Sequence, residues 1–356
     1  MANTFNSFNT PPYLAYLAPI FLRIHTLNNY LSGVKYYMRV SVVIPVAELK
    51  EGIGELLKSL EGSEDLDYEV ILVTPRLPTA LNLRNVKIVR DEGKGPGAAR
   101  NRGVEVAKGD IIAFTDSDCI VSKGWLKLLI EEFDSEEVGI VAGPTLARDL
   151  RSFLSKYLEL SVITPFPKYD RKIIMEGDFK PLTFITTSNL AIRKEVFKLV
   201  GGFDESYRHY GSEDMDLAYR VLKAGYKIAY SPRPLVYHSH RHKLSAILKR
   251  YYEYGVGFAK FFLKHPGSVF SKLAMGGMIS LIVLLLLSSF LLFTPWKLLG
   301  AALTLLPYLG ISSFHLLRGE SRKLALVYAL LDLLLIWVSI IGTLRGILSY
   351  LKAKLT

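Results

Sequence analysis

The sequence predicts an α/β domain with a mostly parallel sheet, followed by an amphipathic segment and an all-α membrane segment. Three observations lead to this fold class. Short apolar runs alternate with helical segments from Val40 to His238, as strands and crossover helices do in parallel sheets. A strongly basic stretch, residues 241–272, comes next. Three long apolar stretches then follow within residues 273–356.

The composition points to an anionic partner and to a lipid environment. Half of the 356 residues are apolar, and the mean hydropathy of +0.25 is high for a soluble protein. The net charge of +11 favours a nucleotide, a nucleic acid or a lipid surface as partner. The single cysteine, Cys119, excludes an intramolecular disulfide and fits a reducing, cytosol-facing domain.

Residues 1–37 differ from the rest of the chain. They contain no acidic residue, and their apolar piece, residues 13–22, is too short to span a bilayer. That piece also lacks the charged n-region of a signal peptide. We therefore expect residues 1–37 to be a poorly structured extension, with Met38 a natural start before the first strand.

Within residues 38–240 each short apolar run, rich in Val and Ile, predicts one buried strand. A glycine at residue 109 is expected as the C′ residue that ends the helix before it. Helices are expected over Ile53–Leu60, Gly97–Ala107 and Trp125–Glu132, and in short segments after Arg193 and up to Leu222. Strands are expected at Val40–Val46, Glu69–Val73, Val86–Val89, Ile111–Phe114, Gly139–Gly143, Tyr226–Tyr230 and Val236–His238.

Two aspartates, Asp116 and Asp118, directly follow the strand predicted over Ile111–Phe114. Burying unpaired carboxylates is costly, and ligands of open α/β sheets bind at the carboxyl ends of the strands. A pair of carboxylates there suits Mg²⁺ or Mn²⁺ bound together with substrate phosphates. Taken alone, the pair also fits a solvated turn, since Asp and Ser are common turn residues.

Two further segments carry candidate binding residues. Gly93–Gly103 is glycine-rich and opens a helix, where free backbone amides attract phosphate, and it contains Arg100 and Arg102. Glu213, Asp214 and Asp216 stand at the start of another predicted helix. Acidic residues at that position also favour a helix through its dipole, which is the structural alternative to a catalytic role.

In this order and spacing, the segments resemble the family 2 glycosyltransferases of the Rossmann-like GT-A fold. The resemblance covers the chain from Val40 to His240. It is carried by the following motifs: the strand ending at Pro45, Ala99-Arg100-Asn101 with Gly103, Asp116-Ser117-Asp118, Asn189 with Arg193, Gly201-Gly202-Phe203-Asp204-Glu205, Glu213-Asp214, Ala224-Gly225-Tyr226 and His238.

The resemblance implies a role for each matching residue. Asp118 would be the more direct ligand of a divalent cation, Mg²⁺ or Mn²⁺, with Asp116 nearer the ribose and His238 completing the metal shell. Asp214 matches the catalytic base and Glu213 its usual neighbour. Residues expected to bind the nucleotide-sugar donor are Pro45, Ala47, Glu48, Asp91, Gly97, Arg100 and Asp116.

The implied chemistry is an inverting sugar transfer, in which a carboxylate takes the proton of the acceptor hydroxyl. A cation would neutralise the charge that develops on the leaving nucleoside diphosphate. The sequence departs from the family pattern at Thr74-Pro75-Arg76, where the family has Asp-Asp-Gly-Ser, and at Ala47 and Cys119. The departures concern recognition of the base, so we assign neither the nucleotide nor the sugar.

Residues 241–272 contain seven Lys or Arg residues against one acid, Glu253, with aromatic and aliphatic residues at helical spacing. This pattern predicts a helix lying in the membrane interface. The alternative is an ordinary amphipathic helix packed on the domain. We do not expect nucleic-acid binding, because the segment runs directly into lipid-like sequence.

Each of the stretches 274–293, 298–317 and 324–344 is long enough to cross about 30 Å of hydrocarbon. Basic residues before the first stretch and between the last two place both segments in the cytoplasm. We therefore expect a multi-pass protein of the cell membrane with a cytoplasmic catalytic domain. Two spans plus a re-entrant helix is an alternative. Asp332, inside the third stretch, is a candidate functional residue.

The function expected from these features is transfer of a sugar to a lipid-linked or membrane-proximal acceptor. A processive polysaccharide synthase is the nearest alternative, although no Gln-x-x-Arg-Trp follows the predicted base. A sugar nucleotidyltransferase would need a glycine-rich loop where Pro45–Glu48 stands. A non-catalytic scaffold would be expected to have lost Asp118 or Asp214.

Overall fold

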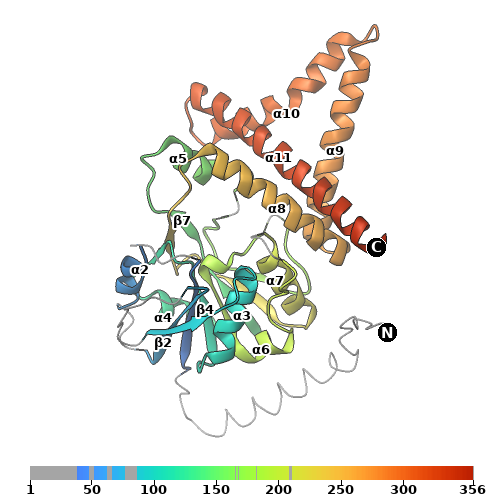
Figure 1. Ribbon diagram of the computed structural model, residues 1–356. Helices are drawn as coiled ribbons and strands as arrows, with labels where there is room; N and C mark the ends of the chain where they lie inside the picture. The colour runs from blue at the N-terminus through green and yellow to red at the C-terminus, as the bar shows by residue number, and fades with distance from the viewer. Residues whose placement is uncertain are drawn as a thin grey trace.

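The strands gather in one domain of the computed structural model, and the long C-terminal helices lie on one side of it (Figure 1). Glu48 and residues 1–37 lie outside the described part of the chain, so the predictions made for them stay predictions. The structure describes residues 38–47, 52–61, 66–76, 86–164, 166, 168–181, 183–207 and 211–355.

The central sheet has eight strands in the order β3-β2-β1-β4-β9-β6-β10-β8, and most of its pairings are parallel, as predicted. Two strands run antiparallel to their neighbours: β9, between β4 and β6, and β8, at the edge. The strands are β1 (Val40–Pro45), β2 (Tyr68–Thr74), β3 (Val86–Arg90), β4 (Ile111–Phe114), β6 (Val138–Ala142), β8 (Ile173–Met175), β9 (Leu190–Arg193) and β10 (Lys227–Tyr230).

A second, three-stranded sheet has the order β5-β11-β7 and packs beside the first. Its strands are β5 (Cys119–Val121), β7 (Thr145–Ala147) and β11 (Val236–His238). The sequence predicted β11 but neither of its partners. β11 pairs antiparallel with β5, which starts one residue after Asp118, so this small sheet brings the end of the domain beside the segment that follows β4.

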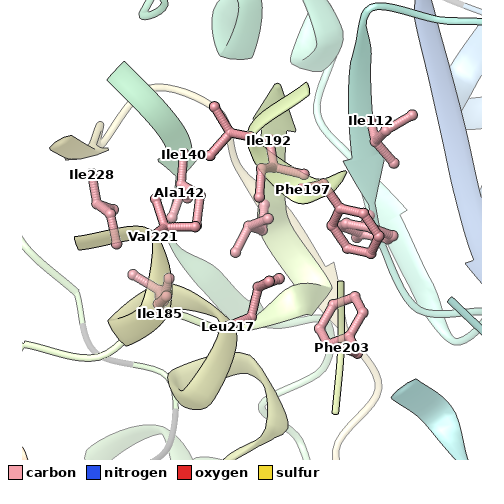
Figure 2. Packing of buried hydrophobic residues seen from close by; sticks show 14 of the residues in the cluster. Ile112, Ile140, Ala142, Ile185, Ile192, Phe197, Phe203, Leu217, Val221 and Ile228 are labelled. Atoms are coloured by element: carbon pink, nitrogen blue, oxygen red, sulfur yellow. The ribbon is translucent and has the colours of Figure 1, made fainter. Parts of the chain in front are cut away.

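Helices cover both faces of the large sheet. Side chains alternate along β1, so that Val43 joins one buried cluster while Val42 and Ile44 join the other. Figure 2 shows part of the first cluster, with Phe197, Phe203 and Leu217 packed below the strand residues. The helices are α2 (Gly52–Leu60), α3 (Pro96–Val106), α4 (Trp125–Ile130), α5 (Phe153–Leu160), α6 (Lys194–Leu199) and α7 (Glu213–Lys223).

The prediction for Gly109 was wrong. Helix α3 ends at Val106, and its C-cap, Ala107, has an extended backbone. Gly109 instead passes so close to β1 that a Cβ atom would lie 2.5 Å from the Ser41 amide nitrogen. The glycine therefore serves close backbone packing and not a helix end.

Three C-terminal helices are long and apolar enough to cross a membrane, which indicates a membrane association. They are α9 (Val269–Leu291), α10 (Lys297–Leu317) and α11 (Arg322–Leu355), the last much longer than the predicted stretch 324–344. Helices α9 and α10 form a hairpin that points away from the α/β domain (Figure 1). Large apolar side chains such as Phe290 of α9 and Leu298 of α10 are mostly exposed, as on a lipid-facing surface.

Helix α8 (Leu244–Lys264) lies between the domain and α11 (Figure 1). Its glycine Gly255 touches the backbone of α11, where a Cβ atom would lie 2.1 Å from the Ser339 carbonyl oxygen. The apolar side chains of α8, including Tyr251 and Phe261, are buried against protein. The location of α8 at a membrane surface stays a prediction, but its apolar face is already covered by other parts of the chain.

Candidate active site

A cavity of about 750 Å³ opens where β1, β4 and β11 end and extends toward α8, α9 and α11. Both predicted functional acids, Asp118 and Asp214, line it. They are nearly a hundred residues apart in the chain and come from different elements. The polar residues at this end of the cavity are Arg100, Asp116, Asp118, Glu213, Asp214, His238 and His240.

The small sheet brings Asp118 and His238 together. The Ser239 amide donates to the Asp118 carbonyl oxygen at 3.2 Å, which continues the β5–β11 ladder by one step. As a result, His238 Nε2 lies 3.5 Å from Asp118 Oδ1. Pairing between β5 and β11 therefore creates the site predicted for a cation.

The residues present fit a divalent cation held by two protein ligands. Burial lowers the pKa of His238, which keeps its imidazole neutral and able to coordinate. The Asp118 side chain is about half exposed, so further ligands can approach from the cavity. Among the described residues no group of three candidate ligands occurs. Mg²⁺ and Mn²⁺ sites commonly combine one or two protein ligands with water and substrate phosphates.

Phe166 and His240 both contact the His238 ring. The Phe166 ring stacks on His240 with centroids 5.5 Å apart and lies 5.3 Å from the His238 ring. The imidazoles of His238 and His240 meet through their Nδ1 atoms at 3.3 Å, and His240 Nε2 lies 3.4 Å from Glu159 Oε2. These contacts fix the orientation of His238. The sequence pattern did not single out His240, Glu159 or Phe166.

Arg100 links Asp116, which follows β4, to Glu213 at the start of α7. Its side chain, on α3, is 1% exposed and donates from Nη2 to Asp116 Oδ1 at 2.8 Å. Nη1 of the same guanidinium lies 3.4 Å from Glu213 Oε1. Arg100 was predicted to bind the donor, and it does line the cavity. The structure adds that it holds Asp116 beside the start of α7.

Asp214 stands at the beginning of α7, after a turn with unusual backbone angles. Ser212 has φ of 64°, and it is the one non-glycine residue of the described chain with a positive φ. Glu213 Oε2 accepts the Gly211 amide at 2.8 Å, and Asp214 Oδ1 accepts the Met215 amide at 2.9 Å. Burial, followed by the neighbouring Glu213 charge, raises the pKa of Asp214 to about 7. A carboxylate with such a pKa is suited to take up a proton near neutral pH.

Helix α8 packs directly against the turn that precedes α7. A Cβ atom on Gly257 of α8 would lie 2.2 Å from the Gly211 carbonyl oxygen, so the two backbones are in direct contact. Gly211 itself has φ of 139°, which a side chain rarely tolerates. Gly211 stands three residues before the predicted base Asp214, in the stretch that the sequence singles out, but the sequence did not predict its contact with Gly257.

A second cavity of about 460 Å³ adjoins the first and collects three of the predicted donor-binding residues: Pro45, Ala47 and Asp91. Gly97 lines neither cavity. It packs on Phe203, because a Cβ atom added to Gly97 would lie 3.2 Å from the Phe203 Cβ. Three basic residues on or just before α8 close this cavity from the other side: Arg241, Lys249 and Arg250. Arg241 and Arg250 also line the first cavity.

The far end of the first cavity is apolar. It is formed by residues from the segment after α5, by Phe184 after β8, and by residues of helices α8, α9 and α11, and none of them belongs to the motifs of the α/β domain. The lining residues of this end include Val162, Ile163, Phe184, Phe258, Phe270, Ala274, Met278, Ser339 and Thr343.

Two family profiles match the part of the sequence that forms this site. The profile of glycosyl transferase family 2 matches residues 41–201, and the profile described as glycosyltransferase like family 2 matches residues 164–266. The chain belongs to glycosyltransferase family 2. The matches include both acidic pairs, Asp116/Asp118 and Glu213/Asp214, and all of the α/β domain from β1 onward.

The chain is also similar to two proteins that are named as glycosyltransferases. The pre-mycofactocin glycosyltransferase of Mycobacterium tuberculosis is 28% identical over 247 residues, which are 67% of this chain and 50% of the relative. An O-antigen chain rhamnosyltransferase of Salmonella typhimurium is 29% identical over 234 residues, which are 62% of this chain and 72% of the relative. The chain thus spans half the length of the mycobacterial relative.

A solved structure shares the fold of this family 2 glycosyltransferase over almost its whole length. It is a mannosyltransferase from Pyrobaculum calidifontis in complex with GDP-Man and Mn²⁺, with a TM-score of 0.58 and 15% sequence identity. The match covers 93% of this chain and 95% of the mannosyltransferase. It confirms the predicted fold class, a GT-A-like domain followed by C-terminal helices.

Proposed function

We propose that this family 2 glycosyltransferase is an inverting, metal-dependent enzyme that moves a sugar from a nucleotide-sugar donor to a lipid-linked acceptor at the membrane. One observation carries the proposal. Asp118 with His238, and Asp214, line a single cavity whose opposite end is apolar and formed by the candidate membrane helices.

Asp214 is the proposed base. Its carboxylate takes the proton of the acceptor hydroxyl while that oxygen forms a bond to C1 of the sugar. The bond between C1 and the diphosphate oxygen breaks on the opposite face, its electron pair leaves with the nucleoside diphosphate, and the configuration at C1 inverts. The raised pKa of Asp214, about 7, supports this role because it makes the carboxylate a stronger base than an ordinary aspartate.

Asp118 and His238 are the proposed ligands of Mg²⁺ or Mn²⁺. Such a cation neutralises negative charge that develops on a leaving diphosphate. Asp116, held by Arg100 at 2.8 Å, lines the same cavity and is the proposed contact for the donor ribose. The Pyrobaculum mannosyltransferase is described with GDP-Man and Mn²⁺, which supports a nucleotide-sugar donor and a divalent cation here.

We propose that the smaller cavity binds the nucleoside of the donor. Pro45, Ala47 and Asp91 provide apolar contact and a carboxylate for the base and ribose. Arg241 and Arg250 stand where the two cavities meet, and their positive charges favour the diphosphate of the donor or the phosphate of an acceptor lipid.

The apolar end supports a lipid-linked acceptor. Phe270 and Met278 belong to α9 and Thr343 to α11, so a chain bound there would lie among helices apolar enough to enter a bilayer. The name of the Salmonella relative, an O-antigen chain rhamnosyltransferase, fits an acceptor of this class. We further propose a multi-pass protein of the cell membrane with its catalytic domain in the cytoplasm, because basic residues precede both α9 and α11.

The test uses the full chain purified in detergent. Release of nucleoside diphosphate is measured for a panel of nucleotide sugars, with Mn²⁺ or EDTA, and with or without a short polyprenyl phosphate. We expect release from one donor that needs Mn²⁺, increases with the lipid phosphate and disappears in Asp214→Asn. Release from no donor, or equal release in Asp214→Asn, would contradict the proposal.

A further inference from the structure

Asp332 is a carboxylate in the middle of α11, one of the helices apolar enough to cross a membrane, and it is 0% exposed. An acidic side chain at such a depth is costly unless other groups donate hydrogen bonds to it. The proposed reaction does not use Asp332, which lies outside both cavities. The burial of Asp332 therefore needs another explanation.

Three side chains donate to this carboxylate. The Tyr157 hydroxyl and the Ser161 hydroxyl both reach Oδ1, at 2.8 and 2.5 Å. On the other side His315 Nε2, from α10, lies 2.7 Å from Oδ2. Tyr157 belongs to α5 of the α/β domain and Ser161 directly follows that helix, so one carboxylate joins two membrane helices to the catalytic domain.

The segment held in this way is a wall of the active-site cavity. Leu158, Val162, Ile163, Thr164 and Phe166 all line the cavity, and Ser161 stands among them. Phe166, at the end of the segment, is the ring that stacks on His240 and contacts His238. The wall therefore reaches from the Asp332 cluster to the proposed metal ligand. We define the described residues 158–164 and 166 as the acceptor wall.

A second contact from the membrane side supports the same wall. The Tyr251 hydroxyl of α8 donates to the Ile163 carbonyl oxygen at 3.3 Å, and the Ser339 hydroxyl of α11 donates to the Tyr251 carbonyl oxygen at 3.2 Å. Apolar packing adds to this, because Tyr157, Tyr251, Tyr328 and Leu335 form a buried cluster separate from those of the α/β domain. Within the described chain the wall is thus attached mainly to α8 and α11 at this point.

We propose that Asp332 is a positioning residue for the acceptor. It holds the acceptor wall against the membrane helices, so the acceptor end of the cavity is complete only when α10 and α11 are paired around this carboxylate. The proposal rests on the function proposed above in one respect, that the wall contacts the acceptor. The donor end meets the wall only where Phe166 contacts His238 and His240, and its other residues are held by β1, β4, α3 and α7, so we expect a smaller effect of Asp332 on the donor.

The principal test compares Asp332→Ala with Asp332→Asn in the purified full chain. Alanine removes the acceptor of all three hydrogen bonds. Asparagine keeps an oxygen for Tyr157 and Ser161, and its amide can donate to His315 Nε2 once the imidazole proton sits on Nδ1. The matched control is Ser288→Ala, which removes another buried polar contact between membrane helices, Ser288 Oγ to Thr304 Oγ1 at 2.7 Å, far from the wall in the chain.

Two measurements follow each variant. Hydrogen–deuterium exchange of the full chain in detergent reports the order of residues 153–166 without reference to any activity. Initial rates give KM for the donor identified by the release panel and KM for a short polyprenyl phosphate. For Asp332→Ala we expect faster exchange in 153–166 and a KM for the lipid raised about tenfold, with the donor KM within about twofold of wild type. Asp332→Asn and Ser288→Ala should stay near wild type in both measurements.

Unchanged exchange over 153–166 in Asp332→Ala would overturn the positioning role, whatever the enzyme does. So would a donor KM that rises as much as the lipid KM, or an Asp332→Asn variant as impaired as Asp332→Ala. A wild-type protein that releases nucleoside diphosphate from no donor would instead count against the proposed function, and the exchange experiment would still decide the structural part of the inference.

Discussion

The two ends of the active-site cavity are built in different ways. At the polar end charged side chains of the α/β domain pair with one another, as Arg100 does with Asp116 and Glu213. At the apolar end the lining comes from α8, α9 and α11 and from a wall tied to Asp332. In the function proposed above, the donor is bound mainly by the α/β domain, and the C-terminal helices complete the acceptor end.

The largest effect is expected for the base at the polar end. Asp214→Asn should lower the transfer rate by about 10²- to 10⁴-fold, because the acceptor hydroxyl loses the group that takes its proton. Donor binding, measured by calorimetry with the nucleoside diphosphate and Mn²⁺, should stay near wild type. Loss of nucleotide binding together with activity would mean that Asp214 holds the donor and is not the base.

The next largest effect is expected for Arg100, which pairs with both Asp116 and Glu213. Arg100→Met leaves the nearly buried Glu213 and the partly buried Asp116 without their shared cation, and should lower the free energy of unfolding by about 3–5 kcal/mol. Thermal unfolding of the purified protein measures this loss. Arg102→Met removes an exposed arginine of the same helix and should change stability little. Equal effects of the two variants would contradict a bridging role for Arg100.

The proposed cation site gives a third prediction. His238→Ala should raise the Mn²⁺ concentration needed for half-maximal activity by roughly 10- to 100-fold, since one of two protein ligands is lost. The exposed His242, outside both cavities, provides the control variant His242→Ala. An unchanged Mn²⁺ requirement in His238→Ala would leave Asp118 as the ligand and remove His238 from the site.

The pH dependence follows from the direction of the Asp214 shift. Its pKa is raised to about 7, so the fraction in the ionised, proton-accepting form increases as the pH rises through 7. We expect kcat/KM for the donor, at saturating acceptor, to fall about tenfold for each pH unit below 7 and to level off above it. A flat profile between about pH 5.5 and 8 would contradict Asp214 as the ionising base.

The smallest effect is expected at the apolar end. Met278→Trp fills space beside the cavity and should raise KM for a polyprenyl phosphate several-fold, with little change in the donor KM. Its neighbour Ile279 is about half exposed on α9 and does not line the cavity, so Ile279→Trp is the matched control. If the lipid KM responds equally to both, the acceptor does not reach this end of the cavity.

Much of the polar end was predictable because its signals are local. Asp116 and Asp118 terminate a short apolar strand, and strand ends meet at one edge of a parallel sheet. The fold class followed from the alternation of strands and helices, and the family assignment confirms it. Asp118 and Asp214 were expected in one pocket, and the structure places both on one cavity, although their roles stay predictions.

What the sequence did not predict depends on pairing between distant segments. Nothing local indicates that Arg100 meets Glu213, which is 113 positions away, or that Tyr157 meets Asp332 across 175 positions. The strand β9 runs antiparallel inside the large sheet, and only the register of its neighbours reveals that. For α8 the periodicity identified an apolar face, but periodicity alone cannot distinguish lipid from protein as its cover.

The contact between Gly257 and Gly211 has a mechanical consequence. Because both residues lack a side chain, two backbones touch directly, and no rotamer change can absorb a shift between them. Helix α8 also meets α11 backbone to backbone at Gly255. If α11 spans a bilayer, as proposed above, a change of its tilt in a thicker or thinner bilayer would act through these backbone contacts on the turn that carries Asp214.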